Sequence, residues 1–102
     1  MLVWFSVTPI GTGSPSVSAE VARAVAASEA TGARCETDAS GTLVEGTWEQ
    51  CMQAVRAAAD AVLETAPRAS LTCKIDVRTD REQSGADKLA SLHRAMKEAD
   101  QP

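Results

Sequence analysis

Residues 1–13 read MLVWFSVTPIGTG, and this stretch decides the fold. Apolar side chains at Val3, Phe5 and Val7 alternate with a second set, which has the two-residue period of a β-strand. The second set is Trp4, Ser6 and Thr8. Pro9 cannot donate to a sheet ladder, so we expect the strand to end there. Because both faces carry bulky groups, the strand is expected to be central, with helices on one face and another partner on the other.

The length and composition of the chain are typical of one globular domain. The chain has 102 residues, 44% of them hydrophobic, which is enough for a core of its own. The net charge is −4 and no basic block stands out, which argues against a nucleic-acid or anionic-membrane partner. We expect no leader, and the sequence contains no apolar run of transmembrane length. We therefore expect a cytoplasmic protein that does not enter a membrane.

The three cysteines are expected to be reduced and buried. Cys35, Cys51 and Cys73 are far apart, form no CxxC pair, and each falls on an apolar position of the predicted elements. Unpaired thiols of this kind are typical of a reducing compartment.

The remaining sequence predicts six further elements. A helix capped by Ser16 ends at Gly32, and strands at 33–38 and 42–45 form a hairpin. Thr47-Trp48-Glu49-Gln50 is a capping box that opens a second helix, which Pro67 stops. A strand at 69–78 and a helix at about 85–99 complete the chain. This order predicts an α+β, ferredoxin-like βαββαβ sandwich with a core at 1–80, an additional C-terminal helix, and a single domain over 1–102.

The second helix and the last strand each have a predicted core face. On the helix it consists of Trp48, Cys51, Met52, Val55, Ala59, Val62 and Ala66. On the strand it consists of Leu71, Cys73, Ile75 and Val77.

Both long helices of this fold cover the same side of the sheet, so its other side, here the open face, lacks a cover. Strand parity places on the open face Leu2, Trp4, Ser6, Thr8, Leu43, Glu45, Thr72, Lys74 and Asp76. A monomer rarely exposes a tryptophan and two leucines together, so we expect a second sheet or a ligand to cover them.

Little in the sequence suggests catalysis. The one histidine, His93, lies among apolar residues of the C-terminal helix, and no metal-ligand spacing, GxSxG elbow or P-loop occurs. We therefore expect no catalytic residues, no metal and no enzyme activity.

The charged residues of the open face allow two interpretations. Glu45, Lys74 and Asp76 could form a solvated or interfacial set of ion pairs, or they could line a pocket. A tryptophan face attracts a flat cation, carboxylates accept from an amino group, and hydroxyls fix orientation. The candidate ligand-binding residues are Trp4, Ser6, Thr8, Glu45, Thr72, Lys74 and Asp76.

Four motifs resemble the YkoF-like thiamine-binding proteins over nearly all of residues 1–80. They are Val7-Thr8-Pro9-Ile10-Gly11-Thr12-Gly13, Ser16-Val17-Ser18, Gly41-Thr42-Leu43-Val44-Glu45-Gly46, and Lys74-Ile75-Asp76 continued by Arg78 and Asp80. The resemblance implies a ferredoxin-like fold, a dimer or tetramer assembled through its sheets, and non-enzymatic binding of thiamine or its hydroxymethylpyrimidine part, with no other cofactor.

Two other functions remain open on the sequence. The open face could serve only self-assembly, in a structural or regulatory module that binds no small ligand. Less favoured is an enzyme of the dimeric α+β barrel kind, because this face offers no His or Tyr for general acid–base chemistry.

Overall fold

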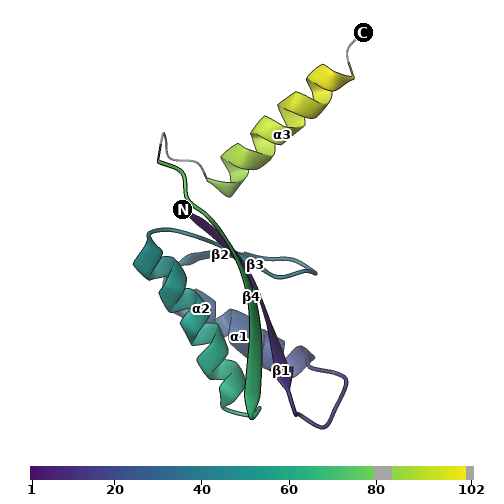
Figure 1. The fold of residues 1–102 in the computed structure, drawn as a ribbon, viewed down its shortest axis with the longest axis vertical. Helices are drawn as coiled ribbons and strands as arrows, with labels where there is room; N and C mark the ends of the chain where they lie inside the picture. The colour runs from purple at the N-terminus through teal and green to yellow at the C-terminus, as the bar shows by residue number, and fades with distance from the viewer. Residues whose placement is uncertain (80–83, 101–102) are drawn as a thin grey trace.

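The predicted fold is confirmed in a computed structural model, in which residues 1–79 and 84–100 are described (Figure 1). The elements are β1 (Leu2–Ile10), α1 (Ser18–Ala30), β2 (Arg34–Thr37), β3 (Thr42–Glu45), α2 (Trp48–Leu63), β4 (Arg68–Asp76) and α3 (Gly85–Ala99). The strands form one antiparallel sheet in the order β2-β3-β1-β4. This is the ferredoxin-like arrangement. Asp80, which extends the fourth motif, lies outside the described residues.

β1 is central, but it is longer than predicted. It pairs with β3 over residues 2–5 and with β4 over its whole length, where Pro9 lies opposite Ala69. The expectation that Pro9 ends the strand was wrong. Beyond Phe5 no strand among the described residues lies beside this edge of β1, so a residue without an N–H is tolerated there.

The core lies between the sheet and the two helices. Val3, Phe5 and Val44 from the sheet pack against a row of alanines, Ala54, Ala58 and Ala24, which lets the helices approach closely. Ser28, completely buried in α1, donates its hydroxyl within 3.0 Å of the Ala54 carbonyl oxygen and within 3.1 Å of its own helix's Ala24 carbonyl oxygen. Its polar group is therefore satisfied inside the α1–α2 contact.

One predicted helix cap is confirmed and one is wrong. Thr47 and Gln50 form the reciprocal capping box of α2. At α1 the N-cap is Val17, without a side-chain hydrogen bond, while the Ser16 N–H donates to the Ser14 hydroxyl. The serine-rich loop bonds within itself, which removes Ser16 from the cap.

Three predictions about burial need correction. Trp48 is 52% exposed, because the residues of α2 that face the core are Cys51, Ala54, Ala58, Ala61 and Val62. Of the cysteines only Cys51 is buried; Cys35 is half-buried and Cys73 is exposed.

On β4, Leu71, Cys73 and Ile75 pair with Val7, Phe5 and Val3 and so share the helix-facing side, as predicted. All three are nevertheless exposed, because β4 is an edge strand. Strand parity predicts which side of the sheet a residue faces, but it does not predict whether its strand lies at the edge of the sheet.

α3 leaves the sandwich and carries no buried residue (Figure 1). Its apolar residues Leu89, Leu92 and Met96 are all more than half exposed. Its first turns are bonded to the sheet through Gly85 and Lys88. The chain therefore has a compact βαββαβ unit and a helix that extends from it.

Candidate functional site

The open face is organised in two rows that cross all four strands. Cross-strand pairing aligns Arg34, Glu45, Leu2 and Asp76 in one row. It aligns Glu36, Leu43, Trp4 and Lys74 in the next. The outer ends of both rows are charged; the centre of the second row is apolar, and the centre of the first row pairs Leu2 with Glu45. The geometry suits a flat ligand lying over the centre with polar groups at its rim.

A pocket of about 620 Å³ lies over these two rows. Its floor includes Trp4 and Leu43, and its remaining wall comes from α3 through Gly85, Leu89 and Leu92. The volume is within the range of small-molecule sites, roughly 300–1,000 Å³. The start of α3 therefore covers part of the open face, for which the sequence predicted no cover from the chain's own helices.

The indole of Trp4 is fixed by close packing at the hairpin between β2 and β3. A Cβ built on Gly41 would lie 2.8 Å from two ring carbons of Trp4 and 2.5 Å from the Phe5 carbonyl oxygen. Only a residue without a side chain fits beneath the ring. The hairpin itself is closed by Asp38, whose carboxylate accepts from the N–H groups of Ser40 and Gly41. These bonds, with the Ser40 hydroxyl first, lower the pKa of Asp38.

Glu45 is the most enclosed carboxylate of the face, with its side chain 18% exposed. Its Oε1 accepts from the backbone N–H of Gly85 at 2.6 Å, and its Oε2 lies 3.9 Å from the Arg34 Nε. A carboxylate at the first turn of a helix is favourable, because the free N–H groups there carry partial positive charge.

Asp76 makes the second attachment of α3. It accepts a hydrogen bond from the Lys88 ammonium, and this bond and charge lower the pKa of Asp76. Lys74 and Arg78 add smaller favourable charge interactions. Glu45 and Asp76 therefore form ion pairs with Arg34 and Lys88, two residues that were not among the predicted ones.

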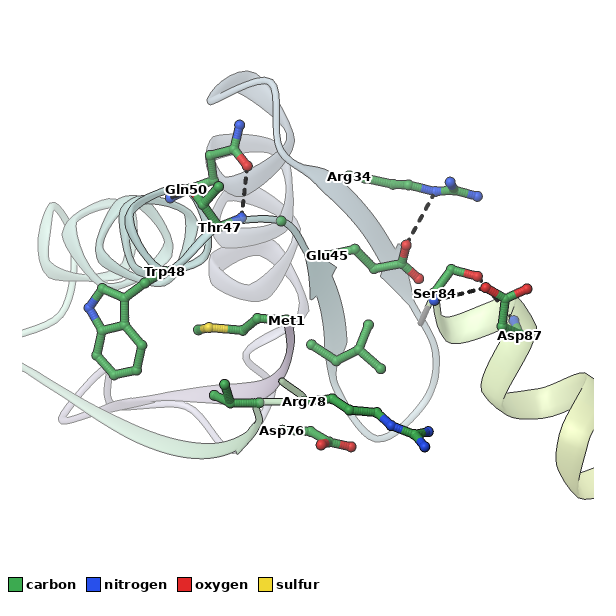
Figure 2. A pocket seen from close by; sticks show the side chains of 13 residues that line it. Met1, Arg34, Glu45, Thr47, Trp48, Gln50, Asp76, Arg78, Ser84 and Asp87 are labelled. Atoms are coloured by element: carbon green, nitrogen blue, oxygen red, sulfur yellow. Dashed lines mark hydrogen bonds and ion pairs between the residues drawn. The ribbon is translucent and has the colours of Figure 1, made fainter. Parts of the chain in front are cut away.

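A second pocket of about 880 Å³ adjoins the first and shares Leu2, Arg34, Glu45 and Asp76 with it. Figure 2 shows Trp48 and Met1 on one side of this pocket and Arg34, Glu45 and Asp87 on the other. Its lining is more polar, and it opens between the starts of α2 and α3.

The structure brings four of the seven predicted ligand-binding residues together, namely Trp4, Glu45, Lys74 and Asp76. Ser6 and Thr72 pair with each other one row further along, and Thr8 beyond them is exposed; none of the three lines either pocket. Sequence reasoning missed Arg34 and Glu36. The alternation of charge at 34, 36 and 38 carried that signal.

Among residues 1–79 and 84–100 no cluster of three or more His, Cys, Asp or Glu side chains could hold a metal ion. None of the helices in this part of the chain is long and apolar enough to cross a membrane.

The fold and the pocket define the class: a small βαββαβ protein with a ligand-sized hollow between its open sheet face and a C-terminal helix. Comparison with known proteins makes this specific. The sequence profile of the thiamine-binding protein family matches residues 3–93, and the chain belongs to this family.

Relatives cover nearly the full chain. A UPF0045 protein of Mycobacterium tuberculosis is 38% identical over 97 residues, which cover 94% of each chain. A UPF0045 protein of Methanothermobacter thermautotrophicus is 40% identical over 89 residues, 85% of this chain and 90% of its own.

Solved structures share the fold. A hypothetical protein from Methanocaldococcus jannaschii superposes with a TM-score of 0.83 at 30% identity, covering 90% of this chain and 94% of its own. A Thermotoga maritima protein named for thiamine biosynthesis or salvage superposes with a TM-score of 0.75, covering 89% of this chain and 96% of its own. Its identity of 24% supports the fold alone.

Proposed function

We propose that this protein binds thiamine, or the hydroxymethylpyrimidine part of it, in the 620 Å³ pocket, and that it does so as an oligomer and without catalysis. The observation that carries the proposal is the placement of Trp4 between Leu43 and Lys74, with two carboxylates in the adjoining row. Family membership supports the ligand class.

The pocket offers a partner for each part of such a ligand. Thiamine has a planar aminopyrimidine ring and a positively charged thiazolium ring. Trp4, Leu43 and Leu89 supply apolar surface for a flat ring, and a cation over the indole face gains further attraction. Glu45 and Asp76 accept hydrogen bonds from an amino group, since an ionised carboxylate has about four acceptor positions. Glu36 supplies negative charge for the thiazolium.

The absence of catalysis is part of the proposal. The ionisable side chains that line the pocket are Arg34, Glu36, Glu45, Lys74, Asp76 and Lys88. Four of these six already form ion pairs with each other. Groups held in this way favour binding and orientation over the exchange of protons with a substrate.

A second candidate is a self-assembling module that binds no small ligand. The observation that favours it is the exposure of Leu89 and Leu92, which line the same pocket and are each more than half exposed. A second copy lying on this face would cover them. The two candidates differ in whether a small molecule stabilises the native protein.

Ligand titration into the Trp48→Phe variant separates these functions, because Trp4 is then the one tryptophan of the chain. We expect saturable quenching of its fluorescence by thiamine or hydroxymethylpyrimidine. We also expect the unfolding midpoint to rise, because a ligand at a hundred times its Kd adds about 2.7 kcal/mol to the free energy of unfolding.

Trp4→Leu should abolish the midpoint shift while the variant stays folded. Thr8→Ala is the matched control, because Thr8 is exposed and outside both pockets, so it should bind as the parent does. No shift with either compound or with thiamine phosphate, at millimolar concentration, would reject the binding proposal and favour the self-assembling module.

A further inference from the structure

We infer that the ligand of the 620 Å³ pocket carries a phosphate ester group, and that Lys74 and Lys88 bind this group while the ring system lies over Trp4. The inference rests on the proposed function and names the class of ligand more closely. It concerns two lysines for which a purely cationic ligand has no matching group.

One end of the pocket is negative. Beside β2 and β3, the carboxylates of Glu36 and Glu45 outnumber the single guanidinium of Arg34. The thiazolium ring and the amino group of the pyrimidine are the positive and the hydrogen-donating parts of thiamine. Both parts therefore find their complement at this end.

The other end of the pocket is positive. Beside β4 and α3, the ammonium groups of Lys74 and Lys88 outnumber the single carboxylate of Asp76. The adjoining 880 Å³ pocket adds one charge of each sign near this end, from Arg78 and Asp87, so the excess of positive charge remains. A ligand whose charges match both ends is positive on its ring and negative on an arm.

The two lysines have donors left for an anion. No hydrogen bond or ion pair joins Lys74 to another residue in the described part of the chain. Lys88 donates to Asp76, which uses one of its three ammonium donors. The pKa of Asp76 is lowered by this bond and by the charge of Lys88, and less strongly by the charge of Lys74, so both positive charges act at the same end. A phosphate offers several acceptor oxygens to such donors.

The two ends are too far apart for a single small ring. Neighbouring strands are about 4.8 Å apart, so the three strand spacings from Glu36 on β2 to Lys74 on β4 measure about 14 Å. Trp4 lies one strand from Lys74. A ring over the indole of Trp4 therefore leaves Lys74 within reach of a short charged arm. Thiamine has a two-carbon arm that ends in a primary hydroxyl, and esterification of this hydroxyl places a phosphate there.

Isothermal titration calorimetry with thiamine and with thiamine monophosphate tests the inference. The parent protein should bind the monophosphate at least about tenfold more tightly, which is the affinity that one charge-assisted hydrogen bond adds. In Lys74→Gln the monophosphate should lose about tenfold in affinity. Thiamine should gain affinity in this variant, because a positive charge no longer faces its thiazolium ring.

Lys97→Gln is the matched control. Lys97 is exposed in the last turn of α3 and lines neither pocket, so this variant removes the same charge elsewhere. Both affinities should then equal those of the parent. Inorganic phosphate at millimolar concentration is the control for a free anion, and it should raise the unfolding midpoint less than the monophosphate does.

The possible outcomes separate the inference from the proposed function. Equal affinities for the two compounds in the parent, or a preference for the monophosphate that persists in Lys74→Gln, would overturn the inference and leave thiamine binding in place. A midpoint rise with inorganic phosphate alone that equals the rise with the monophosphate would identify a free-anion site and would also overturn it. Binding of neither compound would reject the proposed function together with the inference.

Discussion

Replacing Gly41 by alanine tests the packing that fixes Trp4 in the pocket. The new methyl group would lie 2.5 Å from the carbonyl oxygen of Phe5 and 2.8 Å from two atoms of the indole ring. Phe5 is paired with Thr42 in the β1–β3 ladder and with Cys73 in the β1–β4 ladder, so its carbonyl cannot retreat cheaply. The indole must therefore move, and the hairpin must shift with it.

The expected loss of stability follows from overpacking. Extra methyl groups in tightly packed sites cost about 1–3 kcal/mol, and a backbone atom as the obstacle places Gly41→Ala at the upper end, about 2–3 kcal/mol. For a domain of this size each kcal/mol lowers the unfolding midpoint by roughly 4–8 °C, so we expect a fall of at least about 8 °C. Calorimetry measures the midpoint, and denaturant titration measures the free energy.

A spectroscopic readout distinguishes displacement of Trp4 from a general weakening. In the Trp48→Phe background, Gly41→Ala should shift the Trp4 emission to longer wavelength and weaken ligand binding. Gly13→Ala is the control: its φ of +77° makes alanine costly, yet nothing lies within 4 Å, so Trp4 emission should not change. A Gly41→Ala protein within about 0.5 kcal/mol of the parent, with unchanged emission, would refute the packing argument.

Two further predictions concern the helix ends. Thr47→Ala removes the capping box of α2 and should cost about 1 kcal/mol of unfolding free energy; an unchanged midpoint would contradict the role of the cap. The pKa of Asp76 is lowered in the native protein, so its contact with Lys88 stabilises α3 above the ordinary aspartate pKa, about 3.9, and is lost as pH falls through the lowered value. Hydrogen exchange of the first turn of α3, corrected for intrinsic exchange, should accordingly accelerate in acid. The acceleration should be smaller in Asp76→Asn, where the Glu45 carboxylate still accepts from Gly85, and an acceleration equal to the parent's would contradict the role of Asp76.

The fold could be predicted because its signals are local. Alternation in β1, the capping box at Thr47 and the break at Pro67 each fix one element, and the order of elements then allows few topologies. The same signals cannot say how far a helix shields the strand beneath it. Ile75 and Trp48 were therefore expected in the core. Both are exposed, because α2, which carries Trp48, packs on the sheet through Ala54 and Ala58.

The candidate site could be predicted in part for a similar reason. Strand parity places Trp4, Glu45, Lys74 and Asp76 on one face, and the ladder register then brings them together. Parity also selects Thr8, which lies on the same face but beyond the end of β3, where the pocket has no opposing wall. The position of α3 depends on two contacts over long sequence separations, Gly85 with Glu45 and Lys88 with Asp76, which no local pattern encodes.

These two contacts connect the pocket with α3 energetically. The carboxylates suited to accept an amino group of a ligand are the groups that hold the first turns of α3, and one oxygen of Glu45 already accepts from Gly85. A ligand bound to Glu45 or Asp76 must share the carboxylate with α3 or displace it. This coupling is reciprocal. If the attachment of α3 strengthens or weakens ligand binding by a certain free energy, ligand binding strengthens or weakens the attachment of α3 by the same free energy. The affinity of this pocket is therefore a property of the sheet and α3 together, because the open face alone has neither Leu89 as a wall nor the carboxylates in their observed positions.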